Sequence, residues 1–330
     1  MTKITEDIEV VAISRGRVSA QILNVGAALM ELSFEMPDGW RPVILSLHNP
    51  QAYATNPHYL GVIAGRCANR IRGGDCVIDG YAHQLDRNED SVTHLHGGEE
   101  GFSRKRWTIV HRSSCAVELC LHSPDGDQGY PGNLDANCVY EILPDDRLRI
   151  TLSAKADATT LVNLAAHAYF NLLPGSSVLD HKLQVHAAHY TPVDQQLIPD
   201  GRLLPVSGNC FDFTQPARIG ARRNESPNGY DHNFAIATAP HRKPKLAATL
   251  ISPKDDLSMH IITTEPGLQF YDGHKLTAEP GYPDSQLRPF AGCCLEPQRY
   301  PDAIHHADFA SALLPAGSIY KQITEYSFVR

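Results

Sequence analysis

The stretch 115–122, which reads Cys-Ala-Val-Glu-Leu-Cys-Leu-His, places apolar side chains at every second position. Four of them share one face of an extended strand: Cys115, Val117, Leu119 and Leu121. The same period returns in 148–152 and 320–328. Gly, Pro, Asn or Asp interrupts it about every ten residues, which is typical of antiparallel strands joined by turns. No long run carries the apolar stripe of an amphipathic helix, so we predict a mainly β protein.

The organisation of the chain points to one unit rather than several. Turn formers are spread evenly over the 330 residues, and no linker, fixed-period repeat or low-complexity tract divides them. This pattern argues against a propeller or a solenoid. We therefore predict a single domain over 1–330, an all-β fold built as a large antiparallel β-sandwich with few short helices.

Composition excludes several classes of protein. Hydrophobic residues make up 42% of the chain and charged residues 20%, a balance typical of soluble globular proteins. The formal net charge of −8 would repel a phosphate backbone, so nucleic acid is not an expected partner. No run of about 18 apolar residues predicts a membrane span.

The cysteines and the N-terminus predict a cytoplasmic protein. Residues 1–7 include the acidic Glu6 and Asp7, where a signal peptide would have a basic start and an apolar run. The eight cysteines form no C-x-x-C motif, and the only close pair is the adjacent Cys293 and Cys294. We interpret all eight as reduced, mostly buried thiols.

Two histidines precede a double glycine in 93–98, which reads Thr-His-Leu-His-Gly-Gly. On an extended strand, His94 and His96 would share a face, and the glycines would let another group approach the backbone. They could form a ligand site, or a backbone carbonyl could satisfy His94. With Glu100 they also match the spacing of a cupin metal site, but the flanking residues of that motif are missing. We expect no metal and, without a nucleotide-binding glycine motif, no cofactor.

A third histidine, His167, lies in the apolar and aromatic segment 163–172. Burial would disfavour its charged form, and a nearby carboxylate would favour it, so its pKa could be tuned for acid catalysis. Taken alone, the position is more typical of a hydrogen-bonded core histidine than of a catalyst.

Two carboxylates and an amide stand in apolar or aromatic surroundings. Glu296 follows the apolar run 290–295, where a lone carboxylate is costly unless it is paired or used as a general base. The alternative is a glutamate that caps backbone amides. Asp231 lies in the aromatic segment 229–234. Gln269 lies between apolar neighbours, either as a ligand-binding side chain or on an ordinary edge strand.

Three arginines lie among small residues in the segment 61–74. Arg70, after Asn69, could form forked hydrogen bonds with sugar hydroxyls or with a carboxylate, although most arginines cover surface. We expect Arg66 and Arg72 at the surface.

Six blocks of the chain, taken together and in order, resemble the aldose 1-epimerase (galactose mutarotase) family over nearly the full length. The blocks are 65–71, 94–107, 163–172, 230–234, 265–271 and 295–303. The resemblance implies the large β-sandwich of that family, with Glu296 as catalytic base and His167 as catalytic acid. It also implies five substrate-binding residues: Asn69, Arg70, His96, Asp231 and Gln269.

The function implied by this resemblance is the interconversion of the α and β anomers of a free aldose by acid–base ring opening. Such an isomerase needs no cofactor, and its partner is a small sugar; we expect a monomer or a homodimer. Two alternatives stay open. The chain could be an epimerase for a phosphorylated or otherwise anionic hexose, or a non-catalytic carbohydrate-binding protein on the same fold.

Overall fold

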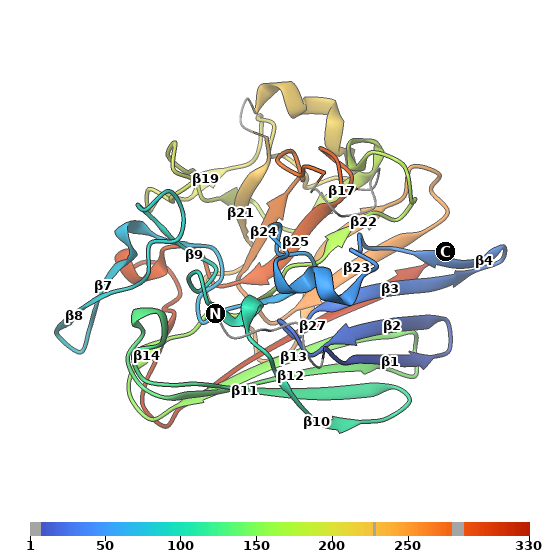
Figure 1. The fold of residues 1–330 in the computed structure, drawn as a ribbon. Coiled ribbons are helices and arrows are strands. Elements are labelled where there is room, and N and C mark those ends of the chain that lie inside the picture. Colours follow the sequence, from blue (N-terminus) through green and yellow to red (C-terminus); the bar gives the residue numbers. More distant parts are fainter. Residues whose placement is uncertain (1–7, 227–228, 279–286) are drawn as a thin grey trace.

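The computed structural model describes residues 8–226, 229–278 and 287–330, and antiparallel sheets dominate it (Figure 1). The largest sheet has nine strands. In their order across the sheet they are β10 (Thr108–Arg112), β11 (Ala116–Ser123), β12 (Leu134–Ile142), β13 (Arg147–Ala156), β27 (Ile319–Val329), β23 (Ser258–Thr263), β22 (Lys245–Ile251), β17 (Lys182–Val185) and β20 (Ala217–Arg218).

A second sheet has six strands and carries much of the site described below. Its order is β16 (Tyr169–Phe170), β25 (Cys293–Gln298), β24 (Gly267–Tyr271), β21 (Asp231–Ala235), β18 (His189–Tyr190) and β19 (Leu204–Pro205). The N-terminal segment forms a third, four-stranded sheet. Its strands are β1 (Val10–Arg15), β2 (Val18–Leu23), β3 (Leu29–Met36) and β4 (Gly39–Pro42).

Short strand pairs and 3₁₀ helices complete the described structure. The pairs are β5 (Ile63–Ala64) with β15 (Ala165–Ala166), β6 (Arg70–Ile71) with β9 (His94–Leu95), β7 (Asp75–Ile78) with β8 (Tyr81–Gln84), and β14 (Thr160–Leu161) with β26 (Leu313–Leu314). The helices are η1 (Pro50–Ala54), η2 (Arg72–Gly74), η3 (Phe102–Arg104), η4 (Asp127–Gly129), η5 (Val178–Asp180), η6 (Ile219–Glu225) and η7 (Ala303–His305).

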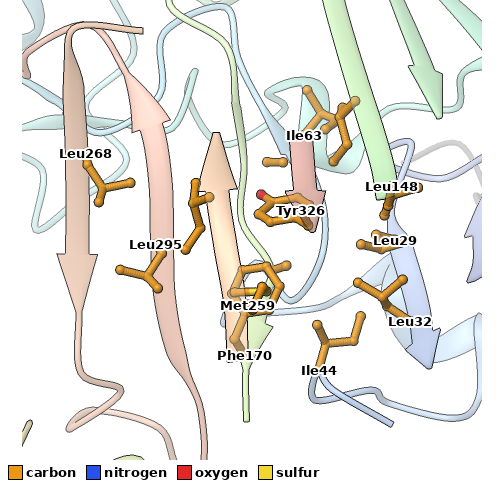
Figure 2. Packing of buried hydrophobic residues seen from close by; sticks show 14 of the residues in the cluster. Leu29, Leu32, Ile44, Ile63, Leu148, Phe170, Met259, Leu268, Leu295 and Tyr326 are labelled. Atoms are coloured by element: carbon orange, nitrogen blue, oxygen red, sulfur yellow. The ribbon is translucent and has the colours of Figure 1, made fainter. Parts of the chain in front are cut away.

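The main core joins all three large sheets and includes the space between the six-stranded and nine-stranded sheets. Leu268 and Leu295 of the six-stranded sheet point toward Met259 and Tyr326 of the nine-stranded sheet (Figure 2). All four side chains are at most 1% exposed, and they belong to one hydrophobic cluster. Each fully buried side chain of this size contributes about 1.5 to 3 kcal/mol, so the contact between the sheets is a main source of stability.

Alternation along β25 connects this core to the opposite face of the sheet. Cys293 and Leu295 point into the core between the sheets. Successive side chains of a strand point to opposite faces, so Cys294 and Glu296 share the other face. The packing that holds Leu295 in place therefore also fixes the direction of Glu296.

The predicted antiparallel β fold is confirmed. Val117, Leu119 and Leu121 are buried on one face of β11, while Cys115 lies just before the strand and is half-buried. All eight cysteines are free and six are buried, in agreement with their interpretation as thiols. No helix among the described residues is long and apolar enough to cross a membrane.

Candidate active site

A pocket of ≈ 190 Å³ opens beside β21, β24 and β25, which lie side by side in Figure 1. It is lined by Pro57, His58, Tyr59, Asn69, Arg70, Glu89, Leu95, His96, His167, Tyr169, Asp231, Gln269, Tyr271, Lys275 and Glu296. All seven residues that the sequence analysis singled out as catalytic or substrate-binding are among them. The fold thus brings together side chains that are up to 227 positions apart in the chain, from Asn69 to Glu296.

A larger cavity, of ≈ 460 Å³, lies elsewhere, between β3, β4 and the segment 171–176. None of the seven predicted residues lines it. Its Glu31 and His48 side chains are 37% and 53% exposed, so they are well hydrated. Chemistry that needs desolvated acid and base groups therefore points to the smaller pocket.

Strand register places two of the predicted residues opposite each other. Gln269 of β24 pairs directly with Glu296 of β25, and residues that pair in this way point to the same face of a sheet. Gln269 is 3% exposed and Glu296 is 2% exposed. Because β24 lies between β21 and β25, it is a central strand, and the edge-strand interpretation of Gln269 is wrong.

Two acceptor atoms of these side chains lack a hydrogen-bond partner in the described part of the chain. Among the described residues, Oε2 of Glu296 and Oε1 of Gln269 are buried and accept no hydrogen bond. A glutamate that caps backbone amides would accept hydrogen bonds from them, so this geometry disfavours the capping interpretation. Because both side chains line the pocket, their oxygens are placed to accept hydrogen bonds from the hydroxyl groups of a ligand.

His167 lies between β15 and β16, where the backbone holds it firmly. Its N–H donates to the carbonyl of Val62, and its carbonyl accepts from the N–H of Gly61, both at 2.9 Å. The imidazole packs against the rings of Tyr59 and Tyr169 and is 5% exposed. Its Nε2 lies 3.8 Å from Oε1 of Glu296, so His167 is buried as predicted but faces a carboxylate.

Burial shifts both groups of this pair toward their uncharged forms. It raises the pKa of Glu296 well above its usual value, because a carboxylate loses hydration, and the negative charge of Asp231 raises that pKa further. Burial lowers the pKa of His167 to about 4. The two groups are 3.8 Å apart, so a single proton can lie on either of them. The form with the proton on His167 and an ionised Glu296 places a general acid beside a general base.

Arg70, on β6, makes a forked contact with a carboxylate. Its Nε and Nη2 donate to the two oxygens of Glu89, each at 2.7 Å, and its Nη1 lies 3.9 Å from Oδ2 of Asp231. Glu89 therefore positions the guanidinium and leaves Nη1 directed toward Asp231. Asp231 in turn accepts a 2.6 Å hydrogen bond from Nε2 of Gln269.

Sequence reasoning missed Glu89. It lies in the polar segment 86–91, where an acidic side chain is typical of a solvated loop, and only its contact with Arg70 distinguishes it. The expectation that Arg66 lies at the surface is also wrong, because this residue is 1% exposed. Its guanidinium donates to acceptors from other segments, including Ser123 and Thr160. The side chain of Arg72 is 51% exposed, as expected.

His96 is held in a defined tautomer. Its Nδ1 accepts a hydrogen bond from the backbone N–H of Asn69 at 3.2 Å, so a neutral ring carries its proton on Nε2. Burial lowers the pKa of His96, which favours the neutral ring. His96 can therefore donate a hydrogen bond from Nε2 while lining the pocket.

The prediction that His94 and His96 share a strand face is wrong. β9 ends at Leu95, and His96 has a φ of 50°, which turns the chain. His94 points away from the pocket: its Nδ1 donates to the carbonyl of Asp86 at 2.6 Å, and its Nε2 accepts from the hydroxyl of Tyr130 at 2.5 Å. The backbone-carbonyl interpretation of His94 is confirmed, and the two rings cannot form the cupin arrangement.

At the double glycine, another segment of the protein's own backbone packs closely against Gly97. Gly97 has a φ of 91°, and a Cβ there would lie 1.7 Å from the carbonyl oxygen of Gly65. A side chain at this position would therefore push the His96 loop away from the strand segment that precedes Arg70. Gly97 is required for the shape of the pocket wall rather than for contact with a ligand.

Comparisons with known proteins bear on this arrangement. A sequence model of the aldose 1-epimerase family matches residues 9–327. Aldose 1-epimerase from Escherichia coli K12 is 36% identical over 317 residues, which is 93% of this chain and 91% of the relative. Galactose mutarotase from Rattus norvegicus is 33% identical, over 94% of this chain and 91% of the relative. The solved galactose 1-epimerase from Lactobacillus acidophilus is 29% identical with a TM-score of 0.86, over 100% and 96% of the two chains.

Proposed function

The chain belongs to the aldose 1-epimerase family, and from this premise we propose that the pocket around His167 and Glu296 interconverts the α and β anomers of a free aldose. One observation carries the proposal. A buried carboxylate and a buried imidazole lie 3.8 Å apart in a pocket, and the second carboxylate oxygen accepts no hydrogen bond from the described residues. Such a pair is costly to bury unless it is used.

The reaction needs one base and one acid. The step starts with the single proton of the pair on His167 and with Glu296 ionised. Glu296 takes the proton from the anomeric hydroxyl while His167 gives its proton to the ring oxygen, and the bond between C1 and that oxygen breaks. The resulting aldehyde rotates about the C1–C2 bond. The ring then closes on the other face of the aldehyde, with both protons moving back. No electron is gained or lost and no covalent bond to the protein forms, so the chemistry calls for no cofactor.

The proposed binding residues supply both donors and acceptors for sugar hydroxyls. Nη1 of Arg70 and Nε2 of His96 donate, whereas Asp231 and Oε1 of Gln269 accept; Asn69 lines the same wall. A sugar hydroxyl both donates and accepts hydrogen bonds, so a pocket with donors and acceptors can satisfy it in both roles. Each positioned acid or base accelerates the reaction roughly 10²- to 10⁴-fold, and holding the sugar beside the pair accelerates it further.

The charges of the pocket favour a neutral sugar over an anionic one. Among the described residues, two carboxylates, those of Glu89 and Asp231, line it against two cations, Arg70 and Lys275, and burial raises the pKa of Glu296 and so favours its uncharged form. Both oxygens of Glu89 already hold Arg70, and Lys275 lies exposed at the rim. A phosphorylated hexose would need an excess of positive charge, which this pocket does not offer.

We further propose a cytoplasmic location. All eight cysteines are free thiols in the structure, six of them buried, although the chain offers enough of them for several disulfides. Free thiols persist in a reducing compartment. The proposed substrate, a free aldose, is a small neutral molecule, and no part of the mechanism requires a nucleic acid or membrane partner.

Polarimetry tests the proposed activity. Added to freshly dissolved α-galactose or α-glucose, the protein should speed the approach to the equilibrium rotation in proportion to its concentration, whereas heat-denatured protein should not. A parallel assay with the corresponding 6-phosphates by NMR compares the anionic alternative. Binding of the free sugars without any acceleration would indicate a carbohydrate-binding protein, and acceleration confined to the phosphates would indicate the anionic substrate.

A further inference from the structure

A third group adjoins the proposed acid and base. Cys294 lies two positions before Glu296 on β25, so both side chains project from the same face of the strand. Its Sγ lies 3.6 Å from Nδ1 of His167, and Nε2 of the same ring lies 3.8 Å from Oε1 of Glu296. The ring-opening mechanism makes no use of this thiol.

The three side chains form a compact set of metal ligands. His167, Cys294 and Glu296 each offer one ligand atom, and these atoms lie within 4.8 Å of one another. A thiolate, an imidazole and a carboxylate are the ligands that Zn²⁺ takes, and tetrahedral Zn²⁺ with bonds of about 2.0 to 2.3 Å holds its ligand atoms about 3.3 to 3.6 Å apart. Small rotations of the three side chains would bring their ligand atoms to these separations.

An independent observation also points to a ligand at this place. Oε2 of Glu296 is buried and accepts no hydrogen bond within the described part of the chain. Asp231 adds a second carboxylate to the neighbourhood, and its charge already acts on both Glu296 and Cys294. A divalent cation would satisfy the free oxygen and would be attracted by the charge of Asp231.

The set has an open side. His167 and Glu296 line the pocket, whereas Cys294 does not. An ion would therefore enter through the pocket and bind the Cys294 thiol beneath the pocket wall. Three protein ligands and one position open to the pocket make an accessible site rather than a closed structural one.

We propose that His167, Cys294 and Glu296 bind a thiophilic divalent cation such as Zn²⁺, and that the bound ion inhibits the enzyme. The inhibition rests on the proposed function, because the ion would occupy the carboxylate lone pair with which Glu296 takes the proton of the anomeric hydroxyl. The binding itself does not rest on it. Mg²⁺ and Ca²⁺ prefer oxygen ligands and should not inhibit.

Inhibition is measured on the protein after dialysis against a chelator. The dialysed enzyme should retain its full turnover, because the ion has no part in the reaction, and added Zn²⁺ should then lower it, whereas added Mg²⁺ should not. Cys294→Ser should raise the half-inhibitory Zn²⁺ concentration at least about 10-fold, since even loss of a partner outside the ligand shell costs that much. Each variant is compared with its own metal-free rate, and Cys120→Ser, a thiol on β11, should keep the original sensitivity.

Direct binding of Co²⁺ separates this site from the question of activity. Wild-type protein and Cys120→Ser should show the near-ultraviolet absorption of a Co²⁺–thiolate bond, and Cys294→Ser should lack it. If Cys294→Ser does not fold, Cys294→Ala takes its place in both experiments. A wild-type protein without this absorption, or a Cys294 variant that remains as sensitive to Zn²⁺ as the wild type, would overturn the proposal. The absorption reports on the site even if no mutarotation is found.

Discussion

Glu296→Gln is expected to lower kcat by roughly 10²- to 10⁴-fold, or about 3 to 5 kcal/mol at 1.36 kcal/mol per tenfold, with a much smaller change in KM. The amide keeps the shape and the hydrogen-bonding reach of the carboxylate but cannot take the proton of the anomeric hydroxyl. Sugar binding should therefore persist while turnover falls. Rates of mutarotation and melting temperatures are measured on the same preparation.

A purely structural glutamate would behave differently. Its replacement would lower the melting temperature and leave the turnover of the folded protein nearly intact. Glu325→Gln provides the matched control, because Glu325 is 4% exposed and holds Arg147 and Arg149 on the nine-stranded sheet, away from the pocket. We expect that variant to be less stable with a near-normal kcat. If Glu296→Gln gives the same result, Glu296 is not the base.

His167→Gln should have an effect of similar size, a fall in kcat of roughly 10²- to 10⁴-fold. The amide can still hydrogen-bond the ring oxygen of the sugar, but it cannot give that oxygen a proton. The leaving alkoxide would then have to take its proton from water, to which this 5% exposed position gives poor access. Turnover is measured by polarimetry and sugar affinity by calorimetry.

His94→Gln is the control for this variant. His94 is also buried and uncharged, since burial lowers its pKa to about 4, but its ring nitrogens bond to Asp86 and Tyr130 outside the pocket. Its loss should reduce stability and leave kcat close to that of the wild type. Equal losses of kcat in the two variants would mean that both histidines act only through the fold.

The β architecture could be predicted because its signal is local. A period of two along 115–122 or 148–152 already separates the core face from the other face of a strand, and the buried Val117, Leu119 and Ile150 follow it. The same rule fails where one residue leaves the extended conformation. A φ of 50° at His96 turns the chain, so its side chain does not share a face with that of His94. The spacing of the two histidines does not predict this turn.

The site depends on contacts between distant segments, which local patterns do not specify. Glu296 and His167 each kept a structural alternative until the register of β24 with β25 and the short pair of β15 with β5 were known. Glu89 and Arg66 were missed because each is defined by partners far away in sequence, 19 positions to Arg70 and 57 to Ser123. Only the resemblance, which covers all segments at once, assembled the pocket beforehand.

In the proposed mechanism, the two buried groups act on the two oxygens at the anomeric centre of a sugar. The most direct test is a crystal structure of the folded Glu296→Gln variant with a bound aldose. We expect the anomeric oxygen within about 2.6 to 3.2 Å of the side chain at position 296, and the ring oxygen at a similar distance from Nε2 of His167. A sugar bound with its anomeric carbon toward Lys275, and with neither oxygen near the pair, would contradict the account.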